Sequence, residues 1–143
     1  MANNPFISDA AAKAAADAIT GLLNSGTLEI YDGSQPTDCN TAITSQNLLG
    51  TFTFGSTAFA ASAASGTAPN RGAVATANSI ADQNASATGT AAWFRAKRSA
   101  GNGSGAIIDG TVGTSGTDLI MTDLSLTAGE AMHVASMTIT VPE

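Results

Sequence analysis

Residues Thr88 to Pro142 read TGTAAWFRAKRSAGNGSGAIIDGTVGTSGTDLIMTDLSLTAGEAMHVASMTITVP, and this stretch decides the fold. Short runs rich in Val, Ile, Thr and aromatic residues alternate with clusters of Gly, Ser, Asn and Asp. This spacing is typical of an antiparallel β-sandwich, in which each run is a strand and each cluster a turn. It predicts strands at residues 90–97, 106–112, 119–122 and 131–141, with a Gly-rich turn at 100–105. Strand parity places Phe94, Met137, Ile139 and Val141 in the core.

The upstream sequence adds further strands to the same sheet system. Residues 27–31 and 48–54 alternate apolar and polar side chains, as half-buried strands do. Residues 57–62 and 73–80 are expected strands of small side chains, and residues 65–72, rich in Gly and Pro, are an expected long loop. The predicted fold is therefore mainly β, an antiparallel β-sandwich of the immunoglobulin-like or jelly-roll-like type, with one N-terminal α-helix.

The N-terminal region predicts that helix. Ser8 or Asp9 is a suitable N-cap, the helix extends to about Asn24, and Gly26 stands where a left-handed residue often ends a helix. One face carries apolar side chains at helical spacing, and the other carries polar ones. The apolar residues are Ala12, Ala15, Ala16, Ile19, Leu22 and Leu23, and the polar ones are Lys13, Asp17 and Thr20. This face either lies across its own sheet or docks on another subunit. We expect residues 1–26 to form a lead and helix, and residues 27–143 a single β-sandwich domain.

Composition excludes several classes of function. The chain has 143 residues, of which 43% are hydrophobic and only 11% charged, with a formal net charge of −6. A negative chain is not drawn to phosphate backbones or anionic lipid, so we expect no nucleic-acid partner. Asp9, Lys13 and Asp17 interrupt the Ala-rich run far below the length of about 20 apolar residues that a membrane span needs, so we expect no membrane partner either. The first residues do not resemble a secretory signal.

Residue types suited to catalysis are scattered along the chain. His133 is the only histidine, and no serine stands in a Gly-x-Ser-x-Gly elbow that would pair with it. Cys39 is the only cysteine, which rules out an internal disulfide. Four aspartates adjoin predicted turns without the spacing of a calcium loop: Asp32, Asp109, Asp118 and Asp123. The sequence therefore predicts no catalytic residues, no metal site, no cofactor and no enzymatic activity.

One cluster favours contact with another protein. Three of the five basic residues lie within four positions beside the only tryptophan, in a chain otherwise poor in charge. The cluster suits a nucleic-acid platform, a solvated strand end or a protein interface, and the interface is favoured because Trp and Arg are enriched in binding hot spots. The candidate interface consists of Trp93, Arg95, Lys97 and Arg98, together with Ile19, Leu22 and Leu23 on the helix.

The order of motifs resembles a known family. An Ala-rich helix ending in Leu22 and Leu23 is followed by GTLEIYDGSQP, LLGTFTFGSTAF, TGTAAWFRAKRSAGN, IIDGTVGTSGTDLIM and LTAGEAMHVASMTITVP. Over nearly the whole chain this order resembles small structural proteins encoded in the virion gene modules of tailed bacteriophages and prophages. The resemblance implies a β-sandwich and, most often, a capsid decoration (cement) protein. It carries over no active residues.

The resemblance also implies partners and a location. A decoration protein assembles in the host cytoplasm, binds the major capsid protein or other virion proteins on the capsid surface, and is present as a homo-oligomer or in multiple copies. A tail or head-fibre component is an alternative, because such proteins have similar folds. A host-surface module that binds carbohydrate is another, and it would use Trp93 or Tyr31 as a stacking platform.

Overall fold

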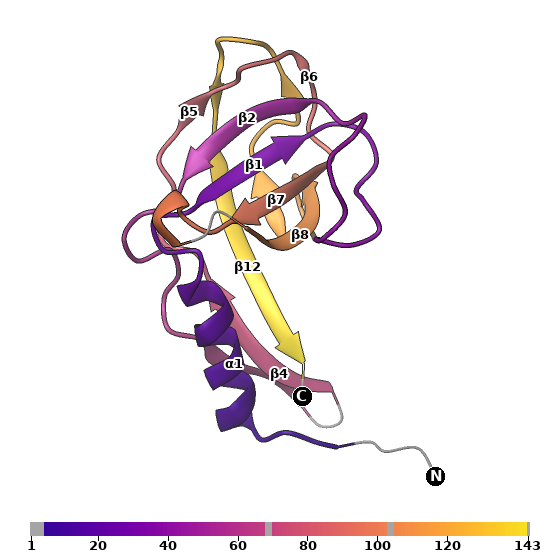
Figure 1. The fold of residues 1–143 in the computed structure, drawn as a ribbon. Helices are drawn as coiled ribbons and strands as arrows, with labels where there is room; N and C mark the ends of the chain where they lie inside the picture. The colour runs from indigo at the N-terminus through magenta and orange to yellow at the C-terminus, as the bar shows by residue number, and fades with distance from the viewer. Residues whose placement is uncertain (1–4, 68–69, 103–104, 143) are drawn as a thin grey trace.

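A computed structural model describes residues 5–67, 70–102 and 105–142, and it shows a mainly β protein with one N-terminal helix and a large mixed sheet (Figure 1). The prediction of a mainly β protein with one N-terminal helix is confirmed. The elements are α1 (Asp9–Gly21), β1 (Thr27–Tyr31), β2 (Leu48–Thr53), β3 (Ala63–Thr67), β4 (Asn70–Thr76), β5 (Gln83–Asn84), β6 (Gly89–Thr90), β7 (Trp93–Lys97), a 3-10 turn (Ala100–Asn102), β8 (Ala106–Gly113), β9 (Leu119–Met121), β10 (Ser125–Leu126), β11 (Ala131–Met132) and β12 (Val134–Pro142).

The main sheet has eight strands in the order β2-β1-β7-β8-β9-β12-β4-β3. Its neighbours pair antiparallel, as expected, except for β8 and β9, which are parallel. That parallel contact covers only two residue pairs, Val112 with Leu119 and Gly113 with Ile120. Two small sheets, β10 with β6 and β11 with β5, lie beside it.

The molecule has two parts joined by β12 (Figure 1). The first, which we call the body, contains β1, β2, β5 to β11 and the first half of β12. The second, which we call the leg, contains α1, β3, β4 and residues 138–142 of β12, and it projects from the body. The register shows the division, because β12 pairs with β9 up to Met137 and with β4 from Thr138 onward.

The body encloses the main hydrophobic core. Phe94 and Met137, predicted to face inward, are buried, with relative exposures of 0% and 1%. Burying a side chain of this size stabilises the fold by about 1.5–3 kcal/mol. The other fully buried large side chains of this core include Leu23, Leu28, Ile30, Leu49, Phe52, Leu119, Met121 and Met132.

In the leg, α1 lies across its own sheet. Ala12 and Ala16 pack against Ala73 of β4 and Val141 of β12, and their small side chains allow close approach of helix and sheet. Ser8 is the N-cap, and its hydroxyl accepts a hydrogen bond from the Ala11 N–H at 3.2 Å. Among the residues described, no helix has the length and apolar character required to cross a bilayer.

Thr20 corrects the predicted polar face of the helix. The sequence pattern places it toward solvent, but it is buried. Its hydroxyl donates to the Ala16 carbonyl at 2.9 Å, one turn back along the helix. This bond satisfies the buried oxygen locally, which is why a polar residue is tolerated in the packed face.

The small-residue segment departs most from expectation. The expected loop at residues 65–72 is a hairpin of β3 and β4, whose residues 68–69 lie outside the described part. The expected strand at residues 57–62 is reduced to a single bridge between Phe59 and Ala77. Backbone pairing does not require large side chains, so Ala, Ser and Gly form strands here without leaving a periodic signal. The predicted turn at 100–105 begins with a 3-10 turn and includes residues 103–104, which are not described.

The glycine after the helix has a different role from the one predicted. Ser25, not Gly26, has the positive φ, at 55°. Gly26 is needed because a Cβ there would collide with the Lys97 carbonyl oxygen and approach the Leu23 carbonyl oxygen to 2.9 Å. This glycine therefore lets the chain pass from helix to β1 in contact with the end of β7.

Replacing this glycine tests the close approach. Gly26→Ala should lower the free energy of unfolding by about 1–3 kcal/mol, because backbone atoms must move to admit the methyl group. Gly21→Ala is the matched control, since nothing lies within 4 Å of its added Cβ and alanine favours the helix, so it should raise stability by about 0.5–1 kcal/mol. Urea unfolding followed by circular dichroism measures both, and equal effects would contradict the proposed contact.

Candidate functional site

Three residues of the candidate interface, Trp93, Arg95 and Lys97, lie on the face of β7 and its neighbours β1 and β8 that points away from the main core. The strand register sets Glu29 opposite Arg95 and Arg95 opposite Asp109, which forms one row of charged residues across three strands. A second row sets Tyr31 opposite Trp93. Sequence parity predicted Trp93, Arg95 and Lys97 on a common face, and the register bears this out.

Arg95 and Asp109 form a buried, two-point ion pair. The Arg95 Nε and Nη2 atoms donate to the two Asp109 carboxylate oxygens, each at 2.7 Å, and the side chains are only 5% and 3% exposed. The planar guanidinium matches the carboxylate geometry, and the Asp109 hydrogen bonds raise the pKa of Arg95. Arg95 therefore stays charged, and the carboxyl group of Asp109 beside it offsets the cost of burying that charge.

The same arginine holds the loop between β1 and β2 over this face. Its Nη1 donates to the Thr41 carbonyl oxygen at 2.9 Å, and Nη2 lies 3.4 Å from the Asp38 carbonyl oxygen. At the start of the loop, the Trp93 indole N–H donates to the Asp32 carbonyl oxygen at 3.1 Å. These three contacts fix residues 32–47 against the sheet.

Aromatic and charged side chains fill the space beneath the loop. The Tyr31 and Trp93 rings stack at 4.7 Å with 13° between their planes, and the Arg95 guanidinium carbon lies 5.6 Å from the Trp93 ring centroid. Glu29 accepts hydrogen bonds from the Tyr31 hydroxyl at 2.6 Å and from the Lys97 ammonium at 2.9 Å. Burial, with the Glu29 contact, raises the pKa of Tyr31 strongly, so its hydroxyl stays protonated as a donor.

This arrangement corrects three of the seven residues of the predicted partner interface. Trp93 and Arg95 are buried beneath the loop, at 1% and 4% exposure, and Leu23 is fully buried in the core, so none of them can contact a partner. Lys97, Arg98 and Ile19 are partly buried, and Leu22 is 37% exposed. Local sequence could not reveal this cover, because it comes from residues 32–47, which lie about 50 to 60 positions before Arg95.

Cys39 lies in the covering loop, close to the buried ion pair. Burial raises the pKa of its thiol to about 11, and the Asp109 charge adds to the effect. The reactive form of a cysteine is the thiolate, which is scarce at neutral pH when the pKa is so high. Cys39 is therefore an unreactive thiol in this loop at neutral pH.

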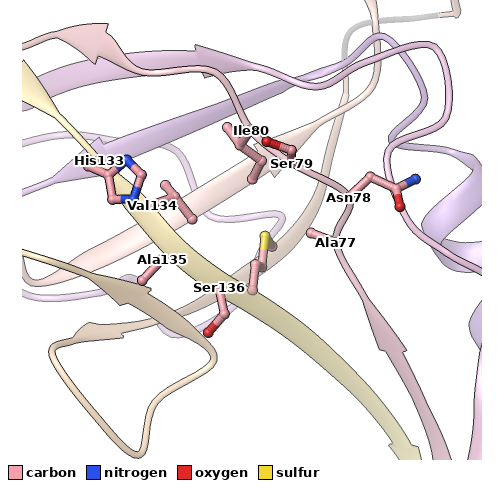
Figure 2. A pocket seen from close by; sticks show the side chains of 9 residues that line it. Ala77, Asn78, Ser79, Ile80, His133, Val134, Ala135 and Ser136 are labelled. Atoms are coloured by element: carbon pink, nitrogen blue, oxygen red, sulfur yellow. The ribbon is translucent and has the colours of Figure 1, made fainter.

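His133 occupies a second candidate position, at a hollow of about 320 Å³ (Figure 2). The hollow is lined by residues 77–80 and 133–137. The His133 Nδ1 atom lies 2.6 Å from an Asp82 carboxylate oxygen, and both side chains are more than half exposed. Figure 2 shows the imidazole apart from Ser79 and Ser136, so the hollow does not bring a serine hydroxyl to this histidine. The contact between His133 and Asp82 could not be predicted from the sequence, because the two residues are 51 positions apart.

Neither metal-ligand geometry nor comparison with known proteins points to a further site in the described residues. Within the described residues, no group of three or more His, Cys, Asp or Glu side chains could hold a metal ion. Comparison of the chain with family models, with curated proteins and with solved structures finds no match. The functional argument therefore depends on the residues, their geometry and the distribution of charge.

Breaking the buried ion pair should destabilise the protein strongly. Asp109→Asn leaves the Arg95 charge buried without a counter-charge, which costs about 3–5 kcal/mol. Asp9→Asn is the control, because the Asp9–Arg71 pair is 3.5 Å apart with side chains nearly half exposed, so its loss should cost less than about 1 kcal/mol. Urea midpoints compare the two variants, and similar midpoints would show that the buried pair does not hold the fold.

Thiol labelling reports on the loop. At pH 8 only about one Cys39 thiol in a thousand is ionised when its pKa is about 11, so labelling by a maleimide should be slow and should rise about tenfold per pH unit. Arg95→Lys removes the two-point pairing and should release the loop, which should make labelling at pH 8 at least tenfold faster. If folded wild-type protein reacts at the rate of a free cysteine, the loop is not closed over this face.

Proposed function

We propose that this chain is a non-enzymatic structural protein of a tailed-bacteriophage virion, a capsid decoration (cement) protein that binds the outside of the head and stabilises it. The motif order described above supports this proposal by its resemblance to virion proteins. The structural observation that best supports this proposed role is an exposed, uncharged sheet surface on the leg. A protein that acts by attachment needs such a surface, whereas catalysis needs converging reactive groups.

The uncharged surface is the side of the leg sheet opposite α1. Side chains alternate across a strand, and Ala73 and Val141 point to the helix, so their sequence neighbours point the other way. We call this side the leg face. Its residues are Ala63, Ser65 and Thr67 of β3, Val74 and Thr76 of β4, and Thr138 and Thr140 of β12, all at least partly exposed.

Charge is distributed unevenly between the two parts. The leg has two acidic and two basic residues, and Arg71 pairs with Asp9 on the helix side of the sheet. The described body has eight acidic residues against three basic ones: Glu29, Asp32, Asp38, Asp82, Asp109, Asp118, Asp123 and Glu130 against Arg95, Lys97 and Arg98. The acidic body favours solubility, and the neutral leg loses little hydration of charged groups when it is covered.

A shell offers many identical sites, which suits a surface of this kind. Each leg face contributes hydrogen-bonding hydroxyls and flat apolar area, without the fixed charges that give strong single contacts. Where two contacts of one molecule bridge neighbouring shell subunits, the second forms at high effective concentration, so weak contacts suffice. Such bridging would stabilise the head against expansion or rupture.

The aromatic side chains expected to stack on a carbohydrate are not exposed at the surface. Trp93 and Tyr31 were the candidate stacking residues, and both are buried and stacked on each other. A tail or head-fibre position uses the same leg face with a different partner, so the location of the chain in the particle distinguishes it from decoration.

Locating the chain in phage particles that encode it tests the proposal. Cryo-electron microscopy should show its density on the outer surface of the head, with the leg face against the shell. Density on the tail or a fibre would replace decoration with the alternative, and absence from the particle would refute a virion role.

A binding assay tests the leg face directly. Thr140→Glu should reduce co-sedimentation with particles lacking the protein by at least about tenfold, because the new charge must be desolvated on contact. Thr122→Glu is the matched control, since Thr122 is an exposed threonine on the body, and it should bind as wild type does. Equal binding of the two variants would move the attachment surface away from the leg face.

A further inference from the structure

The helix of the leg is apolar on its exposed side as well as on its packed side. The exposed residues of α1 and its C-cap that are free of charge are Ala10, Ala11, Ala14, Ala18, Gly21 and Leu22. At 100° per residue they form one continuous face, opposite Ala12 and Ala16. A helix that is apolar on both sides is typical of one buried on both sides. We call this surface the outer face of α1.

Large apolar side chains precede and follow the helix. Phe6 and Ile7, just before the helix, are 80% and 40% exposed, and Leu22, just after it, is 37% exposed. They are three of the four large hydrophobic side chains that the described residues leave exposed; the fourth is Leu48. Most of the exposed large apolar side chains therefore lie in the short segments that flank this helix.

We propose that the outer face of α1 pairs antiparallel with the same face of a second copy of this chain, around a two-fold axis near Ala14. In this pairing Leu22 of each copy lies beside the start of the other copy's helix, and the alanines between the two leucines allow close approach. The face thus meets itself with a large side chain at each edge of the contact and small residues in the middle, as a two-fold interface requires.

The charges beside the face favour the same arrangement. Lys13 and Asp17 lie on one flank of the helix, four residues apart, and Lys13 forms no ion pair with another described residue. In an antiparallel helix pair whose two-fold axis passes between these two residues, Lys13 of each copy lies beside Asp17 of the other. The symmetry therefore gives two ion pairs between the copies. A parallel pair sets like charges together. Asp17 also accepts the Ser62 N–H at 2.7 Å, which lowers its pKa and keeps it charged.

The position of the acidic body points to the antiparallel arrangement as well. The helix runs from the tip of the leg toward the body (Figure 1), where Leu23 enters the core. Antiparallel helices therefore place the two bodies at opposite ends of the pair, and their negative charges stay apart. Parallel helices would bring the bodies side by side, where their repulsion would oppose association.

The size of the face sets the affinity. A helix of 13 residues is about 20 Å long, so the contact is smaller than the roughly 800 Å² per partner of a standard interface. The pair should form in the micromolar range or weaker, and it leaves the leg face on the other side of the sheet free. This inference does not depend on the proposed virion role.

Sedimentation velocity of the full chain, from about 5 to 500 µM, tests the pairing. Wild type should shift from monomer toward dimer as its concentration rises. Ala14→Glu sets two like charges beside the axis and should raise the dissociation constant by at least about tenfold, while Thr122→Glu should leave it unchanged. Circular dichroism should show both variants folded, because Ala14 and Thr122 are exposed.

Cross-linking tests the geometry. In a Cys39→Ser background, Ala14→Cys should give cross-linked dimers with a short bis-maleimide, and Thr122→Cys should not. A monomer throughout the concentration range, a dimer unaffected by Ala14→Glu, or equal cross-linking of the two cysteine variants would overturn the inference. Particle density with the outer face of α1 against the shell would overturn it too, yet would leave the virion role intact.

Discussion

One strand, β12, couples the two parts of the molecule. Its first residues pair with β9 in the body, and its last residues pair with β4 in the leg. Nine residues of extended chain span about 30 Å, which is longer than either part needs for its own sheet. A two-stranded hairpin such as β3–β4 is marginally stable alone, so the leg depends on β12 and α1 to persist. The leg is thus a continuation of the body's sheet, and its faces are held in a fixed direction.

The buried Arg95–Asp109 pair shows how a feature typical of an interface serves the fold instead. Trp and Arg on one strand are frequent at binding hot spots because they combine apolar area with directed hydrogen bonds. Here the same chemistry binds the loop of this chain, through the carbonyl oxygens of Asp32 and Thr41. A loop of polar residues has little apolar surface to hold it in place, so charged hydrogen bonds from below replace hydrophobic packing. The site that sequence assigned to a partner is occupied by the protein itself.

Local patterns predicted the parts of the fold that local physics determines. Alternation in TLEIY located β1, and the Ser8 cap located the start of α1. Strands of two residues, such as β5 and β10, gave no pattern because a single period is too short to show alternation. The hairpin of β3 and β4 was missed because its small side chains do not alternate in hydrophobicity.

The candidate site was partly within reach of the sequence. A turn centred near residue 102 sets residue 95 opposite residue 109, so the Arg95–Asp109 pair follows from the two predicted strands. The burial of that pair could not be predicted from the sequence. The cover comes from residues 32–47, and their polar composition indicates an exposed loop without indicating where it lies. No periodic pattern in a sequence shows where a polar loop packs. The few hydrogen bonds that hold this loop are accepted by single backbone carbonyl oxygens, which any residue type supplies.

The leg has two uncharged surfaces, and their chemistry differs in a way that separates their roles. The leg face is a sheet surface of Thr, Ser and Val, which keeps its hydroxyls hydrated and tolerates exposure to water. The outer face of α1 has no such hydroxyls, and its alanines and Leu22 gain more from being covered, at about 25 cal/mol per Å². A helix pair would therefore form first and in solution, whereas the hydroxyl-rich sheet surface would gain from contact only where many copies bind one assembly. The two surfaces lie on opposite sides of the leg, one on its sheet and the other on the helix packed against that sheet, so the first contact does not block the second. Pairing through α1 would then present two leg faces, and two attachment points on one assembly bind far more tightly than one.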